Sequence, residues 1–164
     1  MHPLDKRNFT MVTTVGMNAD FEGLIKDLIE LEYDAIGAYH ACIERFENTQ
    51  YKMQLQEFVS DHEQHLQDLQ QCARTYNIEI PDGPDMKALL AKGKIVMADM
   101  FGDKAILMAM KTNEDDTVTA YERACEFDDV PSDVLPIFQK GHADELRHRA
   151  WMETTAKTDQ QRAA

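Results

Sequence analysis

The sequence has little of what would divide a chain into many short elements. Only seven glycines and five prolines occur among 164 residues, so turns are few and the elements between them should be long. The three cysteines, Cys42, Cys72 and Cys125, are far apart and have none of the spacings of a disulfide framework or a structural zinc site. This pattern predicts a protein of the reducing cytoplasm. No run of about 18 apolar residues occurs, so no transmembrane helix is expected.

Positive charge is scarce as well. Seventeen lysines and arginines stand against 30 aspartates and glutamates, which gives a net charge of −13. Nucleic acids and anionic membranes attract the opposite charge, so neither is expected as the main partner. Hydrophobic residues still make up 43% of the chain, enough for the core of one domain. We expect a flexible leader over residues 1–17, one helical domain over 18–158 and a short tail over 159–164.

Apolar residues recur with helical spacing in four long segments, at about 19–46, 52–76, 103–127 and 133–156. The segment between the second and third is too long for a hairpin turn. A helix of about 25 residues is roughly 38 Å long, and a short helix at 86–101 could run back along that length. The pattern therefore predicts an all-α four-helix bundle with a long crossover that contains a short helix.

Six polar residues occupy positions where these helical stripes call for an apolar side chain. They are Glu32, His62, His65, Glu114, Glu145 and His148. A histidine there, taken alone, would be explained as a core residue with a hydrogen-bond partner. A lone glutamate would be explained by a misplaced helix boundary or by a side chain that reaches out to solvent. In each antiparallel pair of helices, however, the positions lie equally far from the predicted turn, so they meet at one level. Burying six such groups without a common partner would be very costly, which favours a metal site.

Tyrosines repeat together with the glutamates. Tyr39 follows Glu32 by seven residues, and Tyr121 follows Glu114 by seven residues. Their hydroxyl groups are expected either to hydrogen-bond the carboxylates or, for Tyr39, to take part in redox chemistry.

The histidines repeat within a second motif. The runs Asp61–His65 and Asp144–His148 each read Asp, a potential ligand, two further residues and His. Positions i and i+3 share a helix face, so the potential ligand and the histidine can bind one ion. We expect each aspartate to accept the second ring N–H of the histidine four residues later.

A Glu on one helix and a Glu-x-x-His motif on the next, given twice, resembles the di-iron carboxylate site of the ferritin-like superfamily. The resemblance covers residues 20–156, and the stretches KGKIVMADMFGDKAIL and AYERA are similar to a bacterial ferritin-like group of unassigned function. It implies two bound iron ions and oxidation of Fe(II) by O2 or peroxide. It also implies that Tyr39 is the tyrosine beside the site. The ligands that it implies are Glu32, His65, Glu114, Glu145 and His148.

One position departs from the superfamily pattern. His62 stands where the first half usually has Glu, so the ligand shell would be three Glu and three His. A bridging hydroxide or a fourth acid, Glu63 or Glu122, could balance the charge of two ions. The alternatives are a single ion, or zinc or manganese in place of iron. Glu122 is also the rival of Glu114 as a ligand, although its position relative to the predicted turn favours Glu114.

Two classes of function remain open at this point. One is a di-iron oxidoreductase of the ferroxidase type. The other is a metal-binding or structural bundle that assembles through an exposed apolar face and catalyses nothing. A homo-oligomer is expected in either case, a dimer rather than a cage, because the additional C-terminal helix of ferritin cages is missing.

Overall fold

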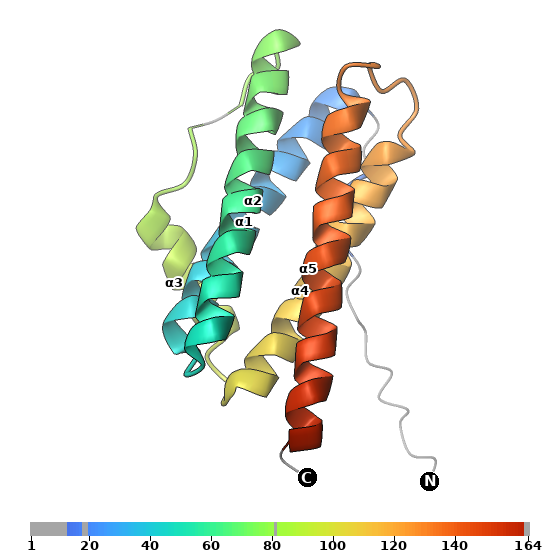
Figure 1. Ribbon diagram of the computed structural model, residues 1–164. Coiled ribbons are helices and arrows are strands. Elements are labelled where there is room, and N and C mark those ends of the chain that lie inside the picture. The colour runs from blue at the N-terminus through green and yellow to red at the C-terminus, as the bar shows by residue number, and fades with distance from the viewer. Residues whose placement is uncertain (1–12, 18–19, 81, 163–164) are drawn as a thin grey trace, which may run out of the picture.

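The computed structural model describes residues 13–17, 20–80 and 82–162, without the side chains of 160 and 162. Over these residues the chain forms five α-helices and no strands. They are α1 (Phe21–Arg45), α2 (Thr49–Thr75), α3 (Met86–Val96), α4 (Asp103–Cys125) and α5 (Leu135–Arg162). The four long helices form a bundle, and α3 lies outside it in the connection between α2 and α4 (Figure 1). The predicted all-α four-helix bundle with a helical crossover is confirmed.

Capping side chains set where the helices begin. The Asp20 carboxylate accepts a hydrogen bond of 2.7 Å from the backbone N–H of Gly23, which satisfies one of the free donors at the start of α1. The Asn48 side chain accepts in the same way from the N–H of Gln50 at 2.9 Å. Because Asn48 is the cap, α2 begins at Thr49, about one turn before the start predicted from apolar spacing.

At one end of the chain the helix boundary differs from the predicted one. The last helix continues beyond the predicted end at 156, as far as Arg162. At the other end, residues 1–12 of the predicted leader lie outside the described residues. Thr13 lies against α4: its backbone N–H donates to Asp116 at 3.1 Å, and its carbonyl accepts from Arg123 at 2.6 Å.

The short helix α3 packs closely along α1. A Cβ atom placed on Gly93 would lie 2.6 Å from the carbonyl oxygen of Gly37, so only glycine permits this approach of the two backbones. The helix ends at Val96, earlier than the predicted end at 101. Gly102, with φ of +82°, then turns the chain into α4 with a backbone conformation that other residues rarely adopt.

The core of the bundle consists of two apolar clusters at opposite ends. One contains residues from the beginnings of α1 and α5 and from the ends of α2 and α4. The other contains residues from the ends of α1 and α5 and from the beginnings of α2 and α4. Large side chains such as Phe138 in the first cluster and Phe58 in the second are fully buried. Among the described helices none has a stretch long and apolar enough to cross a membrane. The polar residues singled out by the sequence lie between the two clusters.

Candidate metal centre

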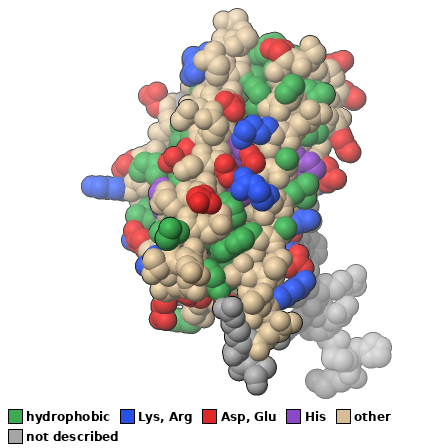
Figure 2. Space-filling model, in the orientation of Figure 1, with side chains coloured by type: hydrophobic (Ala, Val, Ile, Leu, Met, Phe, Trp, Pro, Cys, Tyr) green, Lys and Arg blue, Asp and Glu red, His purple; other side chains and the backbone are tan. Residues whose placement is uncertain are grey.

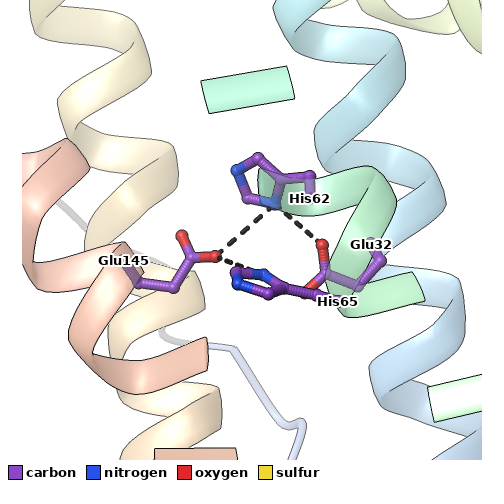
Figure 3. A group of neighbouring side chains, drawn as sticks. All are labelled: Glu32, His62, His65 and Glu145. Carbon is purple, nitrogen blue, oxygen red and sulfur yellow. Dashed lines mark hydrogen bonds and ion pairs between the residues drawn. The ribbon is translucent and has the colours of Figure 1, made fainter. Parts of the chain in front are cut away.

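The structure brings all six polar residues together at the middle of the bundle. Each is at most 2% exposed, and they come from α1, α2, α4 and α5. Figure 3 shows four of them, with the side chains of α1, α2 and α5 pointing toward one another. The equal distances from the turns, counted along the sequence, therefore correspond to a shared level in space.

The ligand atoms form two overlapping groups. One group contains Glu32, His62, His65 and Glu145, and the other contains His62, Glu114, Glu145 and His148. Within each group one potential ligand atom per residue lies within 4.8 Å of all the others. His62 and Glu145 belong to both groups, so they stand between the two halves of the site.

Five buried polar atoms of this centre have no hydrogen-bond partner. They are Nε2 of His62, Nδ1 of His65, Nδ1 of His148 and both carboxylate oxygens of Glu145. Buried polar atoms are nearly always paired, because burial without a partner costs free energy. Imidazole nitrogens and carboxylate oxygens are also the donors that iron, zinc and manganese bind. The residues therefore fit a metal centre.

Most of the acids and imidazoles face one another at distances longer than a hydrogen bond. Nδ1 of His62 lies 2.7 Å from Glu32, which is a hydrogen bond. The Glu145 carboxylate is farther from its neighbours, at 3.4 Å from Nδ1 of His65 and 3.7 Å from Nδ1 of His148. Glu145 is thus surrounded by ring nitrogens without being hydrogen-bonded to any of them.

The outer nitrogens of His65 and His148 are each held by an aspartate, but not by the predicted one. Nε2 of His65 donates to Asp144 at 2.9 Å, and Nε2 of His148 lies 3.0 Å from Asp61. The prediction that each aspartate serves the histidine of its own helix was wrong. Each imidazole crosses the seam between α2 and α5, so its outer nitrogen meets the opposite helix. Holding the proton at Nε2 leaves Nδ1 free as the inward ligand atom.

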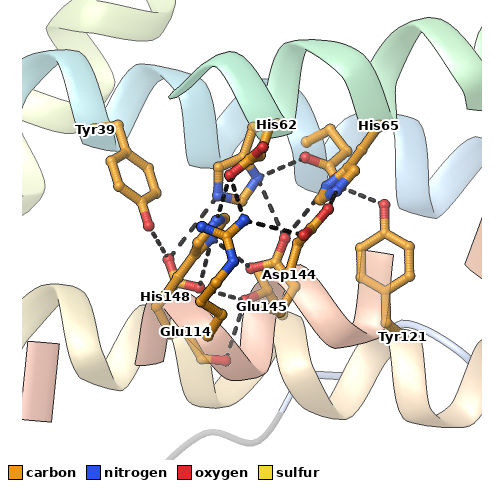
Figure 4. A network of polar contacts seen from close by, with 12 residues as sticks. Tyr39, His62, His65, Glu114, Tyr121, Asp144, Glu145 and His148 are labelled. Carbon is orange, nitrogen blue, oxygen red and sulfur yellow. Dashed lines mark hydrogen bonds and ion pairs between the residues drawn. The ribbon is translucent and has the colours of Figure 1, made fainter. Parts of the chain in front are cut away.

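Each tyrosine likewise contacts the glutamate of the other half of the chain, not the glutamate seven residues before it. The Tyr39 hydroxyl donates to Glu114 at 2.6 Å, and the Tyr121 hydroxyl donates to Glu32; Figure 4 shows both at the edges of the polar network. Hydrogen bonding to the carboxylates, one of the two roles expected for these tyrosines, is thus present. Thr117, which the sequence analysis did not single out, also lies within hydrogen-bonding distance of Glu114.

Burial and the neighbouring charges shift the pKa values of the centre strongly. Burial, together with the nearby Glu145, raises the pKa of Glu114 to about 7. Burial opposes the charged form of His65 and His148, but contacts with the carboxylates outweigh it and raise their pKa values to about 11 and about 10. Burial also raises the pKa of Glu145, but the neighbouring imidazoles lower it more strongly, so the pKa lies well below its usual value. Without metal, protons on the imidazoles balance the carboxylates, so metal binding must displace them.

Neither alternative acid is part of the centre. Glu63 and Glu122 are exposed, whereas Glu114 is 1% exposed, so the structure favours Glu114 as the group from α4. The sequence analysis missed Arg147, whose guanidinium pairs with both Asp61 and Asp144 (2.8 and 3.0 Å). A basic residue three positions after one of these aspartates was the available signal.

Comparison with protein families matches residues 22–127 to a family described as a domain of unknown function (DUF2383). The chain belongs to this family. The match covers α1 to α4 and ends before α5, so Glu145 and His148 lie outside the matched residues. Comparison with curated proteins and with solved structures gives no match.

Proposed function

We propose that this DUF2383 protein is a metal-binding member of the ferritin-like superfamily and that its centre holds two ions, with iron as the expected metal. The observation that carries the proposal is the set of five buried ligand atoms without partners, which face one space from α2 and α5. Desolvating three carboxylates and three imidazoles is costly. Coordination of cations by these atoms would offset that cost.

The pairing within the site suggests how two ions would be shared. Glu32 and His65 would hold one ion, and Glu114 and His148 would hold the other. Glu145 belongs to both groups, and its two oxygens are free, so it would serve both ions. The two ring nitrogens of His62 face different groups: Nδ1 lies 2.7 Å from Glu32, and Nε2 lies 4.0 Å from Glu114.

Iron at this site would supply redox chemistry, the oxidation of Fe(II) by O2 or peroxide, with the carboxylates stabilising the added positive charge. The surrounding residues prepare the site for that chemistry. The two aspartates fix the tautomers of His65 and His148. Tyr39 donates to Glu114, and burial raises its pKa well above the usual value, so its hydroxyl stays protonated and orients the carboxylate. The apolar clusters on both sides exclude bulk water.

Fe(II) added without oxygen, followed by air, tests this function. The wild-type protein should show a ferric absorbance change, and Glu114→Ala should abolish it because one ion loses its carboxylate. Glu122→Ala is the matched control, since it removes an exposed acid from the same helix. A flat trace for the wild type would contradict the oxidase chemistry.

A centre that binds zinc or manganese without redox chemistry is the second candidate. It is favoured by His62, which replaces a carboxylate and leaves three negative charges for two divalent ions. Imidazole nitrogens suit zinc as well as iron. Zn(II) displaces Fe(II) from most nitrogen and oxygen sites whatever their function, so the redox readout separates the two. A wild-type protein that binds Fe(II), Zn(II) and Mn(II) with equal stoichiometry, but gives no ferric absorbance change in air, would support this candidate.

A further inference from the structure

The seam between α2 and α5 carries charged side chains directly above two histidines of the centre. Asp61 belongs to α2, and Lys140, Asp144 and Arg147 belong to α5. Figure 2 shows acidic and basic side chains mixed near the middle of the molecular face on which α2 and α5 lie. The Asp61 and Asp144 side chains are 28% and 17% exposed, whereas that of Arg147 is 51% exposed.

Each of these aspartates contacts both the buried centre and the surface. One Asp61 oxygen accepts from Arg147 at 2.8 Å and lies 3.0 Å from Nε2 of His148. One Asp144 oxygen accepts from His65 at 2.9 Å and from Lys140 at 2.7 Å, and the other accepts from Arg147 at 3.0 Å. The guanidinium of Arg147 therefore joins the two hairpins and neutralises carboxylates that touch the buried rings.

The same two rings carry unpartnered nitrogens on their inner side. Nδ1 of His65 and Nδ1 of His148 are buried and have no hydrogen-bond partner. An ion that reached the aspartates would thus be one imidazole ring away from the ligand atoms of the proposed centre. Carboxylate oxygens at that point can replace part of the water shell that a cation must lose before burial.

At the opposite seam, between α1 and α4, the acidic side chains do not contact the buried centre. A pocket of about 450 Å³ lies there, and Asp34 and Asp116 line it. Asp34 pairs with Lys92, and Asp116 accepts the backbone N–H of Thr13. Lys92 and Thr13 both lie outside the buried centre, and the buried Thr117 stands between the pocket and Glu114.

We propose that divalent cations reach the centre through the α2–α5 seam, where Asp61 and Asp144 form a transient cation site. Arg147, the counter-charge that contacts both aspartates, must move aside, together with Lys140, which contacts Asp144. The proposal rests on the proposed metal-binding function. A half-exposed arginine can leave at little cost, because surface ion pairs contribute little to stability. After the ion has passed, the guanidinium returns, and the aspartates again hold the histidines. Arg147 should therefore control the rate of uptake more than the number of ions bound.

Co(II), mixed with the metal-free protein and followed through its visible absorption in a stopped-flow instrument, tests the route. Arg147→Gln removes the counter-charge and should accelerate Co(II) binding roughly tenfold at low salt, with less acceleration at high salt. The number of Co(II) ions bound at saturation should not change. Equilibrium dialysis measures that number independently of any activity.

Arg149→Gln is the matched control. Arg149 lies on the same helix, and its substitution changes the net charge by the same amount. It pairs with Asp115 of α4 at 3.5 Å and does not contact Asp61 or Asp144. It should change the uptake rate less than twofold. Equal rates for Arg147→Gln and Arg149→Gln, with normal Co(II) binding, would overturn the route and leave the metal centre standing. A wild-type protein that binds no Co(II) would overturn both.

Discussion

Glu145→Gln is the substitution that probes the centre most sharply, because it keeps the shape of the side chain and removes only its charge. Both oxygens of Glu145 are free of hydrogen bonds, and the residue belongs to both ligand groups. Loss of the shared carboxylate should therefore weaken the binding of both ions. The expected readout is the rise in melting temperature that metal produces.

The size of that rise follows from mass action. An ion present at about 100 times its Kd stabilises the folded state by about 2.7 kcal/mol, so two ions contribute about 5 kcal/mol. In a chain of this length 1 kcal/mol corresponds to about 2–4 °C in Tm, which predicts a rise of roughly 10–20 °C. If Glu145→Gln weakens each ion about 100-fold, which is about 2.7 kcal/mol, the same metal concentration raises Tm by only about 2–3 °C.

Melting curves of metal-free and Fe(II)-loaded protein, recorded without oxygen, measure this difference. Any change in the metal-free stability of Glu145→Gln cancels, because each variant is compared with itself. Glu122→Gln, at an exposed position, should keep the wild-type rise. A full rise in Glu145→Gln would show that the carboxylate holds no ion and would refute the reasoning.

Three further predictions concern pH and the fold. The pKa values of His65 and His148 are raised from 6.5 to about 11 and about 10, so their protonation stabilises the metal-free protein fully below about pH 6.5 and less as pH rises toward 10. Melting curves at pH 6.5, 8 and 9.5 should therefore show that the Tm of the metal-free protein falls and that the rise in Tm on adding metal grows. Gly141→Ala places a Cβ 2.4 Å from the Tyr121 ring and should cost about 1–3 kcal/mol in urea unfolding, whereas no loss would mean that the ring moves freely. Asp20→Ala removes the cap of α1 and should cost about 1 kcal/mol by the same measurement.

The level of the polar residues was predictable because helices rise uniformly along their axes. In an antiparallel pair, two residues at equal distances from the turn lie side by side whatever their neighbours are. That relation depends only on the number of residues between each position and the turn. It was therefore sufficient to predict that Glu32 lies at the level of His65 and Glu114 at the level of His148. The four long helices were predictable for a related reason, since apolar spacing reports the buried face directly.

The partners around the centre were not predictable in the same way. Spacing along one helix favours Asp61 for His65, yet Asp61 meets His148 on the facing helix. Which helices face each other across a bundle depends on packing between hairpins, and the sequence pattern of one helix carries no information about it. Helix ends depended on single side chains as well, as Asn48 shows at the start of α2.

Counting metal ions in the purified protein tests the central claim most directly. The chain is loaded with Fe(II) without oxygen, desalted and analysed for iron by elemental analysis, beside Glu145→Gln treated identically. The proposed function predicts two ions per wild-type chain and a marked loss in the variant. A wild-type protein with no more iron than the buffer would contradict the claim that these buried acids and imidazoles bind metal.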